Sequence, residues 1–155
     1  MSDESTELPE MGFASNFDKE ERILLGGFGE FISLNEGEVL INEGHPQDSF
    51  FMVVFGRFHV QTVVTGRSVL LGILKSGDTV GEVNMFDSGN ASASVVSNTL
   101  SQIWKIDRQS LEQYLEAHPR AAARLLVNIS TQLSKRLRST NEKVAMAREA
   151  MLSSF

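Results

Sequence analysis

The chain has 155 residues, of which 41% are hydrophobic and 22% charged, and its formal net charge is −6. This length and composition are typical of one soluble globular domain with its own hydrophobic core. The absence of cysteine excludes disulfides, cysteine-based metal sites and thiol nucleophiles. No apolar run reaches the roughly 18 residues of a membrane span, and the first residues are acidic where a secretory signal would be basic. We therefore expect a cytoplasmic protein without membrane contact.

The N-terminal part predicts a flexible tail and one short helix. Residues 1–13 carry Ser, Glu, Pro and Gly without periodicity, so we expect them to be flexible and the folded domain to span residues 14–155. Asp18 and Glu21 have the spacing of a helix capping box, and Gly26-Gly27 ends the helix that they begin.

Glycine is concentrated in the middle of the chain, where eleven of the twelve glycines lie between Gly26 and Gly89. Glycine accepts the positive φ of tight turns, which predicts turns at Gly56-Arg57 and Thr65-Gly66. The runs between the glycines are rich in β-branched and aromatic residues, which is typical of short strands in a roll, barrel or sandwich. We expect a β-roll over about residues 30–106, with strands at 39–41, 49–55, 58–64, 68–74, 93–97 and 102–106.

Helices are predicted over about residues 107–154. Asp107 can begin the first helix, Pro119 begins the second, and no later Gly or Pro interrupts it. The basic C-terminal part is interpreted as a solvated helix face, with an anion- or nucleic-acid-facing surface as the alternative. The second helix carries a heptad seam, which predicts pairing with a second copy; alternatively its first part packs on the chain's own β-roll. The seam is Leu133, Leu137, Thr140, Val144, Ala147 and Met151.

This order of elements and four segments resemble the cyclic-nucleotide-binding domain family of the catabolite activator protein and the regulatory subunits of protein kinase A. The resemblance implies a fold that is mainly β with flanking helices, namely a double-stranded β-helix (jelly-roll-like β-roll) and a long C-terminal dimerisation helix. Residues 133–144 look like the family's dimer helix. The other matching segments are Gly37–Leu40, Gly44 with Asp48, Phe51–Gly56 and Gly77–Glu82.

The resemblance also implies a phosphate cassette within residues 81–95. By this resemblance Glu82 accepts a hydrogen bond from the ribose 2′-hydroxyl, and Gly81 and Val83 offer backbone groups. Ser92 and Ala93 would hold phosphate oxygens.

The cassette departs from the family pattern at Ala91, where the family places its phosphate-binding arginine. Loss of that charge-assisted contact is expected to remove roughly 1.5–3 kcal/mol or more, a factor of ten to several hundred in affinity.

Three residues of the long helix complete the candidate ligand site. Thr140 and Asn141 stand where the family places base-contacting residues, although Thr140 also fits a residue that sets the register of a coiled coil. Arg136 lies four residues before Thr140 and hence on the same helix face. It can pair with Glu82, or supply positive charge to a bound phosphate.

The sequence offers no catalytic constellation. His45, His59 and His118 are scattered, and no nucleophile elbow or phosphate-binding Gly-Lys loop occurs, so we expect neither an enzyme nor a metal or cofactor site. A β-roll enzyme of the cupin kind would need metal ligands that this sequence does not cluster.

We therefore predict a non-catalytic sensor domain that binds a cyclic nucleotide such as cAMP and signals through its C-terminal helix to a dimer or an output domain. The alternative is a degenerate relative that has lost its ligand and serves in dimerisation or docking. The chain carries no helix-turn-helix after the long helix, so we expect no DNA binding by this chain.

Overall fold

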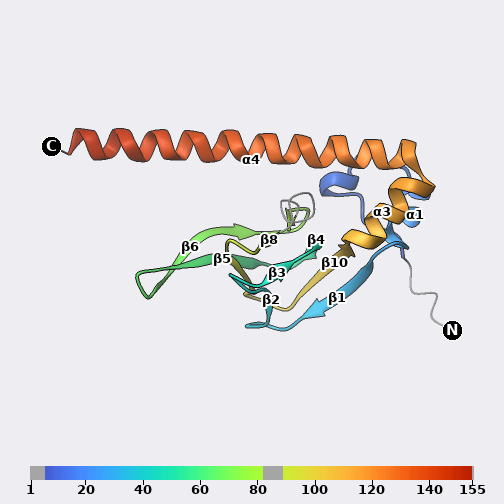
Figure 1. Cartoon of the computed structure of the whole chain (residues 1–155), viewed down its shortest axis with the longest axis horizontal. Coiled ribbons are helices and arrows are strands. Elements are labelled where there is room, and N and C mark those ends of the chain that lie inside the picture. The colour runs from blue at the N-terminus through green and yellow to red at the C-terminus, as the bar shows by residue number, and fades with distance from the viewer. Residues whose placement is uncertain (1–5, 82–88, 155) are drawn as a thin grey trace.

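The computed structural model describes residues 6–81 and 89–154. A β-roll lies beneath one long helix, and the N-terminal segments and a second C-terminal helix pack at one end (Figure 1). The helical elements are η1 (Gly12–Ala14), α1 (Lys19–Gly26), α3 (Arg108–Ala117) and α4 (Pro119–Ser153). The strands are β1 (Glu30–Leu34), β2 (Val39–Ile41), β3 (Pro46–Gln47), β4 (Ser49–Phe55), β5 (Phe58–Val64), β6 (Arg67–Leu74), β7 (Thr79–Val80), β8 (Gly89–Asn90), β9 (Ser94–Ser97) and β10 (Ser101–Asp107).

The strands form two four-stranded antiparallel sheets. One sheet has the order β1-β10-β4-β7 and the other the order β2-β9-β5-β6, while β3 and β8 pair separately. Strands that are adjacent in the sheets are distant in the sequence, as in β1 with β10 and β2 with β9, which is the winding of a β-roll. The predicted fold class is confirmed.

The predicted strands agree closely with the structure. Those at 39–41, 49–55 and 58–64 have the predicted limits, and the other three differ by one residue at one or both ends. The hairpin between β5 and β6 turns at Thr65 and Gly66, with φ angles of 48° and 77°. Positive φ at both central residues is the condition for the turn type that matches the twist of a hairpin.

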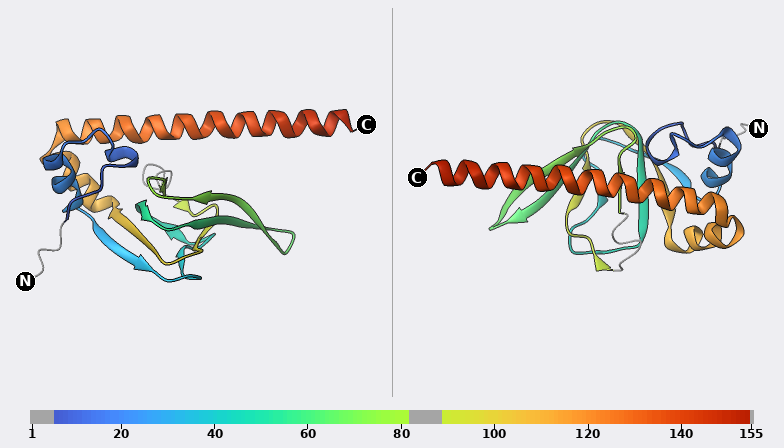
Figure 2. Two further views of the ribbon diagram at one scale, coloured as in Figure 1. Left: turned by 180° about the vertical axis from the view of Figure 1, so that it is seen from behind. Right: turned by 90° about the horizontal axis from the view of Figure 1, so that it is seen from above.

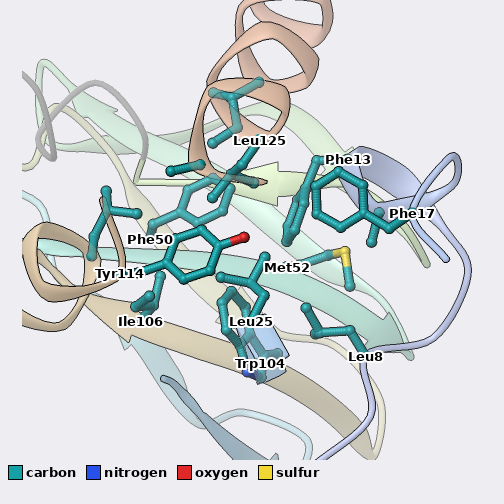
Figure 3. Packing of buried hydrophobic residues seen from close by; sticks show 14 residues of the cluster. Leu8, Phe13, Phe17, Leu25, Phe50, Met52, Trp104, Ile106, Tyr114 and Leu125 are labelled. Atoms are coloured by element: carbon teal, nitrogen blue, oxygen red, sulfur yellow. The ribbon is translucent and has the colours of Figure 1, made fainter. Parts of the chain in front are cut away.

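Strand alternation divides the hydrophobic core into two clusters. The first lies between the outer face of the β1-β10-β4-β7 sheet and the helices, and Figure 3 shows Trp104 and Tyr114 packed within it. The second fills the inside of the roll, where Phe51 and Val53 of β4 point away from Phe50 and Met52. The first cluster therefore holds the helices to the roll, and the second holds the strands of the roll together.

The prediction of a flexible tail through residue 13 is wrong for the described part of that segment. Leu8 and Phe13 are 0% and 1% exposed, and the ring of Phe13 lies 5.4 Å from that of Phe50 and 6.0 Å from that of Trp104. The backbone N–H of Leu8 also donates to the carbonyl of Arg22 at 3.2 Å. Apolar residues spaced irregularly along the segment anchor it, so the lack of periodicity did not mean a lack of contacts.

The C-terminal helices begin as predicted. The carboxylate of Asp107 accepts the N–H of Ser110 at 2.7 Å at the start of α3, and Pro119 occupies the first turn of α4. The 35 residues of α4 make a helix about 50 Å long at 1.5 Å per residue, and its C-terminal part extends past the roll (Figure 2).

The heptad seam of α4 passes from contact with the core into solvent. Leu133 packs against the outer core cluster, whereas Leu137, Val144 and Met151 are 61%, 61% and 67% exposed. Packing on the chain's own roll therefore accounts for the beginning of the seam and leaves the rest uncovered.

Candidate functional site

A pocket of about 340 Å³ lies between the β5–β6 hairpin, the segment around β7 and the middle of α4. Its volume falls in the range of small-molecule sites, about 300–1,000 Å³. Figure 1 shows the hairpin running under α4 on the side where the helix leaves the roll. The described residues that line it are Val60, Leu71, Gly72, Ile73, Leu74, Asp78, Thr79, Val80, Arg136, Ser139, Thr140 and Lys143.

The two walls of the pocket differ in chemistry. The hairpin side is apolar and includes Leu71 and Ile73, which are 58% and 52% exposed. The helix side carries the cations of Arg136 and Lys143 and the hydroxyls of Ser139 and Thr140. Arg136, Thr140 and Lys143 recur at spacings of four and three residues, which places them on one face of the helix. An apolar wall opposite a cationic, hydroxyl-bearing wall suits a ligand with a flat apolar part and an anionic part.

Hydrogen bonds hold α4 to the strand that leads into the cassette. Thr79 is 1% exposed, and its hydroxyl donates to the side-chain carbonyl of Gln132 at 3.1 Å. One Nη of Arg136 donates to the backbone carbonyl of Thr79 at 2.8 Å. Two successive turns of α4 thus bond to one buried residue at the edge of the pocket, which fixes the helix relative to β7.

Gly81 begins the predicted cassette in a conformation that requires glycine. Its φ is 89°, and a Cβ at this position would collide with the backbone carbonyl of Ser49. The amide of Gln47 donates to the same carbonyl at 2.9 Å. The backbone at residue 81 is therefore packed closely against β4.

Two predicted ligand contacts, Glu82 and Val83, lie outside the described residues. Arg136 is held by its bonds to Thr79 on the described side of the site. The predicted pairing of Glu82 with Arg136 stays a prediction.

The second half of the predicted cassette lies along the turn between β2 and β3. Ala91 is 6% exposed and belongs to the core cluster inside the roll. Its N–H donates to the carbonyl of His45 at 2.9 Å, and its carbonyl accepts the N–H of Gly44 at 2.8 Å. Ser92 is exposed and Ala93 is half-buried. Gly44, which matches the family pattern, thus holds Ala91 in place through its backbone.

Of the predicted helix residues, Arg136 and Thr140 line the pocket and Asn141 does not lie among its described lining residues. The hydroxyl of Thr140 donates to the carbonyl of Arg136 at 2.9 Å, one turn earlier. Asn141 is exposed.

Sequence reasoning missed Thr79 and Lys143, both of which line the pocket. Lys143 follows Arg136 by seven residues, so the helical period already indicated that the two residues share one face of the helix. Thr79 lies in a two-residue strand that carries no periodic pattern.

The described residues include no group of three or more His, Cys, Asp or Glu side chains placed to hold a metal ion. None of the helices in the described part of the chain has the length and hydropathy that crossing a bilayer requires.

Comparison with known proteins places this chain in a family. The sequence profile of the cyclic nucleotide-binding domain matches residues 31–118, more than half of the chain. The chain is 28% identical over 115 residues to a CRP-like cAMP-activated global transcriptional regulator of Mycobacterium tuberculosis, covering 74% of this chain and 50% of the regulator. It is also 29% identical over 141 residues to Glutaminase 1 of Bradyrhizobium diazoefficiens, covering 91% of this chain and 22% of the glutaminase.

The chain therefore spans half or less of the length of these curated relatives. Among solved structures it is similar to a cyclic nucleotide-binding domain from Methylobacillus flagellatus, with a TM-score of 0.78, 22% identity, and coverage of 83% of this chain and 72% of that one. At that identity the likeness supports the fold, and the matching profile supports the family. From the roll, the cassette glycines and the profile match, the chain belongs to the cyclic nucleotide-binding domain family.

Proposed function

We propose that this chain is a non-catalytic sensor domain that binds a cyclic nucleotide in the pocket between the β5–β6 hairpin and α4. The observation that carries the proposal is the position of α4 as one wall of that pocket. A ligand in the pocket contacts the same helix that continues beyond the roll. Ligand binding can therefore bias the position of α4 by differential contact with its polar face.

The proposed output is a change in a dimer or in an attached domain. The exposed part of the seam, with Leu137, Val144 and Met151 facing solvent, supports pairing with a second copy through α4. The name of the M. tuberculosis relative supports cAMP as the first nucleotide to test. The proposal retains the predicted cytoplasmic location.

Calorimetric titration of the full chain with cAMP, cGMP and cyclic dinucleotides tests the proposal. We expect saturable binding of at least one cyclic nucleotide. Thr140→Val removes a hydroxyl from the pocket wall and is expected to weaken that binding, and Glu82→Ala is expected to abolish it if the family role holds. A matched control is Thr131→Val, since Thr131 lies in the same helix and its hydroxyl makes the same bond to the carbonyl four residues earlier, at 2.9 Å.

The result that contradicts the proposal is silence across the whole panel at millimolar ligand. That outcome favours the degenerate relative, in which the fold serves dimerisation or docking alone. Binding that Thr140→Val and Thr131→Val weaken equally would place the ligand elsewhere on the chain.

A further inference from the structure

The segment that should bind phosphate carries no basic side chain. The sequence has no lysine, arginine or histidine between Lys75 and Lys105, a stretch that contains the whole cassette. Ala91, at the family's arginine position, is 6% exposed within the apolar cluster inside the roll. A phosphodiester that leaves water needs a compensating positive charge or a full set of donors, since burying an unpaired charge costs several kcal/mol.

The described cations of the pocket both come from α4. Arg136 and Lys143 are seven residues apart, which is two turns of helix and about 10.5 Å along the axis. The carboxylate in the described lining, Asp78, accepts the backbone N–H of Lys75 at 2.9 Å and closes its own turn. The positive side of the pocket is therefore the helix.

The two cations differ in how they are held. Arg136 donates to the carbonyl of Thr79 and is fixed against β7. Lys143 is exposed, and within residues 6–81 and 89–154 its ammonium makes neither an ion pair nor a hydrogen bond. A lysine on a flexible four-carbon stem acts as a mobile point charge for phosphate, which suits a residue at the open side of a pocket.

We infer that Lys143 contacts the phosphate of the bound nucleotide and, with Arg136, supplies the positive charge that the cassette lacks. The phosphate then lies between the cassette and α4, and the base lies against the apolar wall formed by Leu71 and Ile73. This inference rests on the proposed function, because it assigns the orientation and the charge contact of the ligand in that same pocket.

The test compares Lys143→Gln with Lys135→Gln in the full chain. Lys135 is the matched control because it lies in the same helix but lines a different surface groove, with Leu126 and Arg138. Affinities are measured calorimetrically for cAMP and for adenosine, which lacks the phosphate, at two salt concentrations.

We expect Lys143→Gln to weaken cAMP binding by about tenfold or more, the usual effect of losing a charge-assisted contact, and to leave adenosine binding unchanged. Lys135→Gln should change neither affinity, and Lys143→Arg should restore most of the cAMP affinity. The affinity of the wild type for cAMP should fall with added salt more steeply than that of Lys143→Gln. If adenosine binds too weakly to measure, this difference in salt dependence decides the question.

Two results would overturn the inference while leaving the proposed function standing. One is equal cAMP affinity and equal salt dependence in the wild type and Lys143→Gln. The other is an equal loss of cAMP and adenosine affinity in Lys143→Gln, which would show an effect on the helix or the dimer and not on a phosphate contact. Absence of any cyclic-nucleotide binding by the wild type would instead reject the proposed function, and this inference with it.

Discussion

Substitution of Leu137 by Glu is expected to break a dimer that forms through α4. Leu137 is 61% exposed in the single chain and stands in the heptad seam. Burying a leucine side chain completely stabilises by about 1.5–3 kcal/mol, so covering about 60% of it contributes about 1–2 kcal/mol in each copy. Because a two-fold dimer uses the residue twice, Leu137→Glu loses about 2–4 kcal/mol, and the buried carboxylates add to the loss.

A loss of this size raises the dimer dissociation constant by about 30-fold to 1,000-fold. Sedimentation velocity over a range of protein concentrations measures the change directly. The matched control is Met146→Glu, because Met146 is 70% exposed and lies nine residues from Leu137, which is half a revolution around the helix. Far-ultraviolet circular dichroism should show the same helix content in both variants.

The seam hypothesis fails if Leu137→Glu and Met146→Glu shift the association constant equally. It also fails if the wild type sediments as a monomer at high micromolar concentration. In the first case the dimer interface would not follow the heptad seam. In the second case the exposed seam would not pair with a second copy of this chain.

Three further predictions concern the pocket and the helix caps. Thr79→Val removes the hydroxyl that donates to Gln132, so we expect the free energy of unfolding to fall by about 1 kcal/mol and the melting temperature by about 2–4 °C. An unchanged melting temperature would show that this hydrogen bond does not hold α4. Ala91→Arg is expected to raise the affinity for cAMP at least tenfold. The new guanidinium would lie against the inner core cluster and destabilise the free protein. No gain in the affinity measured by calorimetry would mean that Ala91 does not occupy the arginine position. The hydrogen bond from the Ser110 backbone N–H lowers the pKa of Asp107 below 3.8, so the stability that the carboxylate contributes is present above that pH and is lost as pH falls through the lowered value. Asp107→Ala should cost about 1 kcal/mol at pH 7 and progressively less as the carboxylate becomes protonated, and a loss independent of pH would contradict the cap.

Local chemistry determines the elements that sequence reasoning predicted well. The capping carboxylates of Asp18 and Asp107, the turn at Thr65-Gly66 and the start of α4 at Pro119 each depend on a few adjacent residues. β3, β7 and β8 were missed because two residues cannot show a period of two, and β1 was also not predicted as a strand. The N-terminal segment was missed because its buried residues, Leu8 and Phe13, are held by contacts with distant elements, and such contacts leave no periodic pattern.

The candidate site also contains residues that the local sequence predicts and residues that depend on distant contacts. Arg136 and Thr140 were identified by resemblance and line the pocket. Together with Lys143, which follows at the helical period, they form a strip along one face of α4 that we call the pocket strip. Thr79 was not predictable because its importance arises from a pairing of residues 53 positions apart in the sequence. The apolar wall from β6 was predicted as a strand, but which of its faces meets α4 depends on how the hairpin twists in the fold.

The pocket strip and the seam of α4 are adjacent positions on one helix. Arg136 precedes Leu137 and Lys143 precedes Val144, so both cationic pocket residues are followed, 100° around the helix, by a seam residue, and Thr140 belongs to the pocket and to the seam. A ligand that turns or shifts α4 by its pocket strip must therefore move the seam as well. Linkage makes such coupling reciprocal: if cAMP tightens the dimer by a given factor, dimerisation tightens cAMP binding by the same factor. Leu137→Glu should then weaken cAMP binding although Leu137 does not line the pocket, and Met146→Glu should not. Equal cAMP affinity in wild type and Leu137→Glu, at concentrations where only the wild type is dimeric, would show that pocket and seam are energetically independent.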